Sequence, residues 1–151
     1  MLSIASTIEI APGVHMPRLG LGTYKVPEGA VTETVVAHAL SLGYRSIDTA
    51  SLYANEEGIG RALAASGLPR EELFVTTKVW NDEQGYEGTL AAFERSAVRL
   101  GVDYVDLYLV HWPIPEHTEG TWQAMEELHS TGRARAIGVC NHLESHLQAL
   151  L

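Results

Sequence analysis

The chain has 151 residues, of which 46% are hydrophobic and 19% charged, and its formal net charge is −9 with histidine neutral. This composition is typical of a globular domain rather than a disordered chain, and the negative charge argues against nucleic acid or an anionic membrane as a partner. The single cysteine, Cys140, excludes an internal disulfide, and neither a basic leader nor a run of ~20 apolar residues is present, so we expect a cytoplasmic protein.

Residues 5–17 predict a β-hairpin. Apolar and polar residues alternate over Thr7–Ala11 and Val14–Met16, and Pro12–Gly13 between them is a turn signal. We expect this hairpin to cover the bottom of the structure that follows.

From residue 19 onward the chain repeats one βα unit. Short apolar runs that end in polar or glycine-rich residues predict five buried strands: Leu19–Gly22, Arg45–Asp48, Leu73–Lys78, Val105–His111 and Ala134–Asn141. The strands begin at a nearly constant interval, which indicates a parallel sheet built from crossover units. No linker divides the chain, so we expect residues 1–151 to form a single domain.

Amphipathic helices are predicted between the strands. Apolar residues recur at helical spacing in four segments, which contain Val31, Val35, Ala39 and Leu42; Ile59, Leu63 and Ala64; Leu90, Phe93, Ala97 and Leu100; and Trp122, Met125 and Leu128. Gly43, Gly67, Gly101 and Gly132 follow these patterns, where a helix end requires positive φ. A further helix begins after His142.

Two parallel architectures compete for this pattern. The glycine pairs at Gly20–Gly22 and Gly58–Gly60 do not complete a dinucleotide-binding fingerprint, and no phosphate-binding P-loop is present. We therefore predict an α/β fold of the (β/α)₈ TIM-barrel type, incomplete here, because a whole barrel of ~250 residues needs eight units and this chain supplies about five.

Chemistry in such a barrel lies at the carboxyl ends of the strands. The polar residues predicted there are Asp48, Lys78, His111 and Asn141, with Tyr53 in the loop after the second strand. A buried ammonium beside a carboxylate, a phenol and an imidazole can polarise and protonate a carbonyl oxygen. No side chain can donate hydride, so these residues imply a redox cofactor.

Each of these residues also has a structural interpretation. Asp48 and Lys78 could form a structural ion pair, Tyr53 could be a half-buried loop aromatic, and His111 a packed histidine. We expect no metal at His142 and His146 despite their i, i+4 spacing, and we expect Cys140 to be an inert buried thiol. The acids after Asn55 are typical of a helix start.

The sequence resembles the aldo-keto reductases. The resemblance is carried, in family order, by Met16–Thr23, Gly43–Ala50, Leu52–Gly60, Thr76–Asn81, Val105–Pro113 and Ala136–Asn141. It implies a barrel that binds NADPH, with NADH also possible, and reduces aldehydes or ketones to alcohols. Tyr53 would then be the proton donor, with Lys78 and Asp48 tuning it and His111 positioning the substrate.

The resemblance also implies binding residues. Thr23 and Asp48 match positions near the nicotinamide ribose, and Asn141 matches the contact to the nicotinamide carboxamide, next to Cys140 where many members have serine. The substrate pocket would be lined by Tyr24, Trp80, Trp112 and His111, which suits an apolar or aromatic carbonyl compound.

The last three units of the family barrel are absent from this sequence, and they normally hold the cofactor phosphates with basic residues. Two functions therefore remain open. In the first, the sequence belongs to a carbonyl reductase; in the second, it is a catalytically inactive half-barrel that acts as an assembly or binding module. If the chain is truly truncated, the unpaired strand edges of the incomplete barrel predict self-association.

Overall fold

The computed structural model describes residues 3–150. The predicted hairpin is confirmed: strand β1 (Thr7–Ala11) pairs antiparallel with β2 (Val14–Pro17). All five predicted parallel strands are also confirmed, in chain order across one sheet: β3 (Gly20–Gly22), β4 (Ser46–Asp48), β5 (Phe74–Val79), β6 (Val105–Val110) and β7 (Ala134–Val139).

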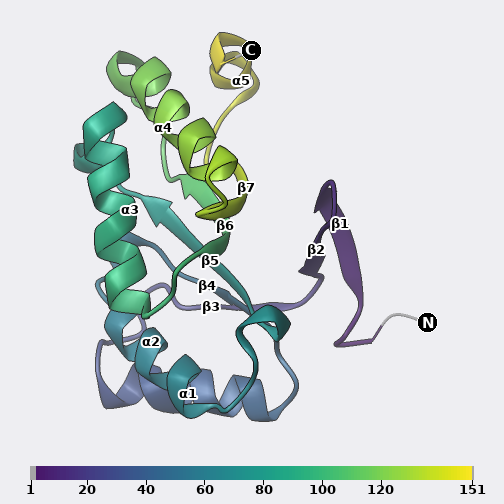
Figure 1. Cartoon of the computed structure of the whole chain (residues 1–151). Helices are drawn as coiled ribbons and strands as arrows, with labels where there is room; N and C mark the ends of the chain where they lie inside the picture. Colours follow the sequence, from purple (N-terminus) through teal and green to yellow (C-terminus); the bar gives the residue numbers. More distant parts are fainter. Residues whose placement is uncertain (1–2, 151) are drawn as a thin grey trace.

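Helices follow the strands as the periodicity predicts. They are α1 (Ala30–Ser41), α2 (Glu56–Ala65), α3 (Tyr86–Leu100), α4 (Thr118–Ser130) and α5 (Glu144–Leu150). Figure 1 shows α1 to α4 on one side of the sheet and the hairpin on the other. The four glycines predicted to end helices all have positive φ.

The buried face of two helices differs from the prediction. In α1 the buried residues include Val36 and Leu40, whereas Val31 and Leu42 are exposed. In α2, Ala62 is buried and Ala64 is exposed. Alanine, threonine and valine recur so often in α1 that several stripes look equally apolar, and only the packing against α2 and the sheet selects one.

The main core lies between the sheet and the helices. Its large fully buried side chains include Ile47 from β4, Phe93 from α3 and Tyr108 from β6. The rings of Phe93 and Tyr108 pack edge to face with centroids 5.1 Å apart, a favourable arrangement of aromatic quadrupoles. This core fixes the strand ends from which the candidate site is built.

The hairpin packs near the amino-terminal ends of the strands. Val14 of β2 is buried in a small cluster with Phe74, the first residue of β5, and Ala136 of β7. The Arg135 guanidinium donates to the carbonyl oxygen of Gly13 in the turn at 3.4 Å. The hairpin is therefore at the end of the sheet opposite to the predicted chemistry, as expected.

Within residues 3–150, no helix combines the length and the apolar composition that crossing a membrane requires.

Candidate active site

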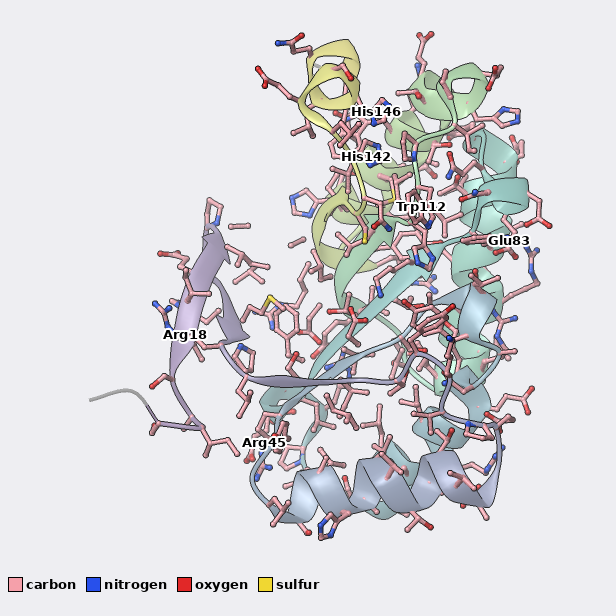
Figure 2. The ribbon with its side chains drawn as sticks, turned by 180° about the vertical axis from the view of Figure 1, so that it is seen from behind. Arg18, Arg45, Glu83, Trp112, His142 and His146 are labelled. Carbon is pink, nitrogen blue, oxygen red and sulfur yellow. The ribbon has the colours of Figure 1, made fainter. Side chains whose placement is uncertain are left out.

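The residues predicted to carry chemistry gather at the carboxyl end of the sheet. Asp48 is the last residue of β4, Lys78 is the second-last residue of β5, and His111 directly follows β6. Tyr53 ends the short 3₁₀ helix η1 (Ser51–Tyr53) that follows β4. Figure 2 shows this end of the sheet near Trp112 and Glu83, far from Arg45 at the strand starts.

Strand register brings Asp48 and Lys78 together. Asp48 lies opposite Thr76 in the β4–β5 pairing, and Lys78 follows two residues later on the same face because side chains alternate along a strand. The Lys78 ammonium donates to Asp48 Oδ1 at 2.7 Å and to the carbonyl oxygen of Thr49 at 2.9 Å. Lys78 is only 4% exposed, and a buried ammonium is tolerable only with such partners.

The Tyr53 ring packs among groups that could act on a carbonyl. Lys78 Nζ lies 5.1 Å from the centre of this ring, and the His111 ring is 5.6 Å away in an edge-on arrangement. The Tyr24 ring lies 5.0 Å away in a tilted arrangement. A phenol beside an ammonium and an imidazole is a suitable proton donor to a developing alkoxide.

His111 is held as a buried neutral imidazole. Its backbone N–H donates to the carbonyl oxygen of Val79 at 3.2 Å, and its ring packs edge-on against Trp80 at 5.2 Å. Burial lowers the pKa of His111 and the Lys78 ammonium lowers it further, against the weaker opposing effect of Asp48. At neutral pH His111 therefore offers one ring N–H and one acceptor nitrogen.

These groups open into a cavity of about 430 Å³. Its lining combines residues predicted for the site with two that were not, Leu52 and Asn81; the others are Tyr24, Tyr53, Trp80, His111, Trp112 and Asn141. Tyr24 and Trp112 are 61% and 45% exposed, so the aromatic rim is open. This size and mixed lining suit a small organic molecule.

A larger cavity of about 580 Å³ adjoins the first and shares Leu52 and Trp80 with it. Half of its ten lining residues are acidic, but Glu28, Glu56 and Glu83 are each paired with an arginine. Because Tyr53 and His111 line the smaller cavity and not this one, the smaller cavity is the one that holds the candidate chemistry.

Asn141 stands at the end of β7 with a left-handed backbone, φ 59°. Its side-chain amide donates to the carbonyl oxygen of His111 at 2.9 Å and contacts Cys140 Sγ at 3.2 Å. These contacts orient the amide at the cavity and leave its oxygen without a partner in the described chain, so Asn141 is suitably placed to bind a carboxamide.

Thr23, the other predicted cofactor contact, is fully buried. Its hydroxyl and its backbone N–H both bind the carbonyl oxygen of Asp48, at 2.9 and 3.0 Å. In this structure Thr23 therefore supports the end of β4, and it is not accessible to a ligand.

The residues present fit the nicotinamide end of a dinucleotide better than its phosphates. Eight of the ten Lys and Arg side chains are already in ion pairs within residues 3–150. Of the other two, Arg18 binds the carbonyl oxygen of Thr7 on the hairpin, and Lys25 lies over the Tyr24 ring at 5.3 Å. The described residues provide no cationic cradle for a pyrophosphate.

Sequence reasoning missed the role of Asn55. The prediction of a simple helix start was incomplete, because the fully buried Asn55 side chain makes no capping bond and instead joins three segments. Its amide donates to the carbonyl oxygens of Thr23 and Val26 at 2.9 and 3.0 Å, and its oxygen accepts from the Thr49 hydroxyl at 2.8 Å. A single sequence does not distinguish an asparagine that caps a helix from one whose buried side chain joins several segments.

The neighbouring acid was also misread in part. Glu56 is 1% exposed and is bound by Thr77 at 2.6 Å and by Arg99 at 2.7 Å. It therefore joins α2 to β5 and α3 behind the site, rather than facing solvent at a helix start.

His142 and His146 lie with ring centres 5.9 Å apart. His142 Nδ1 bonds the carbonyl oxygen of Cys140 at 2.8 Å, and His146 Nδ1 accepts from the Leu143 N–H at 3.1 Å. Both rings are thus engaged by the backbone. Residues 3–150 contain no group of three or more metal-ligating side chains in range of one ion.

Comparison with known proteins places this arrangement in a family. A family model described as "Aldo/keto reductase family" matches residues 18–151. The chain is 52% identical over 149 residues to glyoxal reductase of Bacillus subtilis, covering 99% of this chain and 54% of that protein. It is 46% identical over 152 residues to methylglyoxal reductase DkgA of Yersinia pestis, with coverage of 99% and 54%.

Solved structures agree. The aldo/keto reductase from Brucella melitensis superposes with a TM-score of 0.92 at 45% identity, covering 97% of this chain and 57% of that one. The Bombyx mori aldo-keto reductase, solved in complex with NADP, gives a TM-score of 0.87 at 37% identity, with coverage of 99% and 54%. These matches confirm the predicted partial TIM barrel.

The chain spans about half the length of the curated relatives it matches. Because the family model and the fold agree, the chain belongs to the aldo/keto reductase family.

Proposed function

We propose that this chain carries the carbonyl-reducing centre of an NAD(P)H-dependent oxidoreductase. The observation that supports this most strongly is that Tyr53 and His111 line one cavity, while the Lys78 ammonium lies 5.1 Å from the centre of the Tyr53 ring and is held by Asp48 at 2.7 Å. Bound nicotinamide would supply the hydride that the carbonyl carbon accepts.

The residues of the chain act on the carbonyl oxygen. As negative charge develops there, Tyr53 donates its phenolic proton, and the neighbouring Lys78 ammonium stabilises the phenolate that results. Asp48 keeps the ammonium in place, and neutral His111 donates a ring N–H to the same oxygen and orients the substrate.

We propose small aldehydes and ketones as substrates, dicarbonyl compounds among them. A cavity of about 430 Å³ with aromatic walls and a polar end is compatible with such molecules, and two relatives at 52% and 46% identity carry the names glyoxal reductase and methylglyoxal reductase.

The nicotinamide end and the phosphate end of the cofactor would be bound by different groups. Asn141 would hold the nicotinamide carboxamide through its free amide oxygen. The phosphates need cations that residues 3–150 do not offer at the site, so we propose that tight binding requires a further polypeptide segment. In a sample of this chain alone, the cations outside ion pairs, Arg18 and Lys25, would have to come from a second copy.

Titration of NADPH into the purified chain tests this proposal, with quenching of Trp80 and Trp112 fluorescence as the signal and NADH run in parallel. Saturable quenching that strengthens with protein concentration is expected. A folded chain, judged by far-UV dichroism, that shows no quenching at any protein concentration would contradict cofactor binding by this chain.

A non-catalytic assembly module is the second candidate. It is favoured by the sheet itself: in the described chain, β3 and β7 each pair on one side only, and free strand edges recruit other chains. Sedimentation velocity over a range of concentrations tests self-association. An ideal monomer at all concentrations would contradict both this module and the second-copy route to cofactor binding.

A further inference from the structure

Two short turns contribute residues to the lining of the candidate cavity. One is η1, which contributes Leu52 and Tyr53; the other is the 3₁₀ helix η3 (Asn81–Glu83), whose first residue, Asn81, lines the cavity after Trp80. Neither turn is part of the sheet. The distance between the proton donor and the aromatic wall therefore depends on contacts outside the strand register.

One contact joins these turns directly. The hydroxyl of Ser51, the first residue of η1, donates to Glu83 Oε2 at 2.7 Å, and Glu83 is the last residue of η3. The other carboxylate oxygen of Glu83 accepts from the Arg95 guanidinium of α3 at 2.8 Å. We call Ser51, Glu83 and Arg95 the turn clamp.

The charge state of Glu83 strengthens the hydrogen bonds of the turn clamp. Burial raises the pKa of the Glu83 carboxyl, but the hydrogen bonds from Arg95 and Ser51 outweigh it and leave the pKa below its ordinary value. Glu83 is therefore ionised at neutral pH, and a hydrogen bond to an ionised acceptor is stronger than one between neutral groups.

The rest of the Tyr53 loop shows why the clamp matters. Asn55 and the Lys78 contact to the Thr49 carbonyl fix the two ends of the loop. Between them, Ala54 has a left-handed backbone, φ 53°, a conformation that costs energy for a residue with a Cβ and needs support from its surroundings. The Ser51 hydroxyl connects this part of the loop to Glu83.

We infer that Glu83 is a positioning residue: through Ser51 it fixes the Tyr53 turn against the Trp80 turn, and so sets the width of the cavity and the aim of the phenol. The inference rests on the proposed function for its catalytic consequence only. Glu83 does not line this cavity, so it acts through Ser51 and not on a substrate.

Hydrogen exchange of the free chain tests the clamp without cofactor or substrate. Ser51→Ala removes the donated bond; Ser51→Thr restores a hydroxyl; Glu33→Ala, which removes a partner of the exposed Arg61, is the matched control. We expect exchange at the Tyr53 and Ala54 amides to become about tenfold faster in Ser51→Ala and to stay near the original rate in the other two. Unchanged exchange in Ser51→Ala, or equal acceleration in Glu33→Ala, would overturn the inference.

Kinetics with NADPH then test the consequence. The probe substrates are methylglyoxal, which is the smaller, and benzaldehyde. We expect Ser51→Ala and Glu83→Ala to lower kcat several-fold for methylglyoxal and less for benzaldehyde, because a wider cavity misplaces small molecules most. Ser51→Thr should recover kcat. Equal losses for both probes, or no recovery, would overturn the positioning role, whereas inactivity of the unmodified chain would contradict the proposed function and leave the exchange result to decide on the clamp.

Discussion

The Lys78 ammonium lies 2.7 Å from the Asp48 carboxylate across two neighbouring parallel strands. The two partners are not equally buried: the Lys78 side chain is 5% exposed, whereas that of Asp48 is 39% exposed. Removing either partner therefore leaves the other in a different solvent environment, and the consequences differ.

Asp48→Asn should cost more stability than Lys78→Met. In the first variant a buried ammonium loses its charged partner, which we expect to cost about 2–3 kcal/mol, near the lower end for a broken buried pair. In the second, water can solvate the half-exposed carboxylate that remains. Urea unfolding of both variants provides the measurement, and an equal or reversed order would contradict the burial asymmetry.

The buried Glu56–Arg99 pair should matter more than an exposed pair of similar geometry. Glu56 is inaccessible and its carboxylate accepts from Arg99 at 2.6–2.7 Å. Arg99→Ala therefore leaves a buried carboxylate without its charged partner and should lower the free energy of unfolding by about 3 kcal/mol or more. Arg61, which contacts three carboxylates at the surface, is the matched control, and its alanine variant should unfold close to the parent midpoint. Similar losses in both variants would show that the burial of Glu56 does not govern the pair.

His111 should make the fold less stable in acid. Because the pKa of His111 in the folded chain is below its ordinary value of 6.5, the unfolded chain binds a proton that the folded chain resists as the pH falls below 6.5. The contribution of His111 to stability is thus complete above about pH 6.5 and is lost below it.

The free energy of unfolding, measured by urea titration between pH 5 and pH 7.5, checks this. We expect it to rise with pH in the parent chain and to rise less steeply in His111→Gln. A titration of the His111 ring by NMR above pH 6.5 would refute the assignment of a buried neutral imidazole.

The sequence allowed the sheet and its order to be predicted because each buried strand is a short apolar run that ends in polar residues, as Val105–Val110 before His111 illustrates. The site followed from the same rule: residues at carboxyl ends of parallel strands must meet. Ser51, Asn55 and Glu56 escaped prediction because their partners, Glu83, Thr23 and Arg99, lie 32 or more positions away and no local pattern marks such contacts.

The buried faces of α1 and α2 could not be read from periodicity for a similar reason. Alanine, valine and threonine occupy most positions of α1, and α2 contains three alanines, so a stripe shifted by one residue is nearly as apolar, and contacts between the two helices choose between them. Hydroxyl and methyl groups of similar size fill the same space, so Thr32 occupies a fully buried position that the sequence alone would assign to a hydrophobic residue.

The most direct test of the account is NADPH-dependent formation of the alcohol from methylglyoxal by the 151-residue chain and by Tyr53→Phe, with Tyr24→Phe as the control because both rings line the cavity. The phenylalanine keeps the ring that packs beside Lys78 and removes the phenolic hydroxyl, and with it the transferable proton. We predict turnover by the parent and the control, and a loss of about 10²–10⁴-fold in Tyr53→Phe with cofactor affinity nearly unchanged. Turnover by Tyr53→Phe at the parent rate would contradict the assignment of Tyr53 as the proton donor.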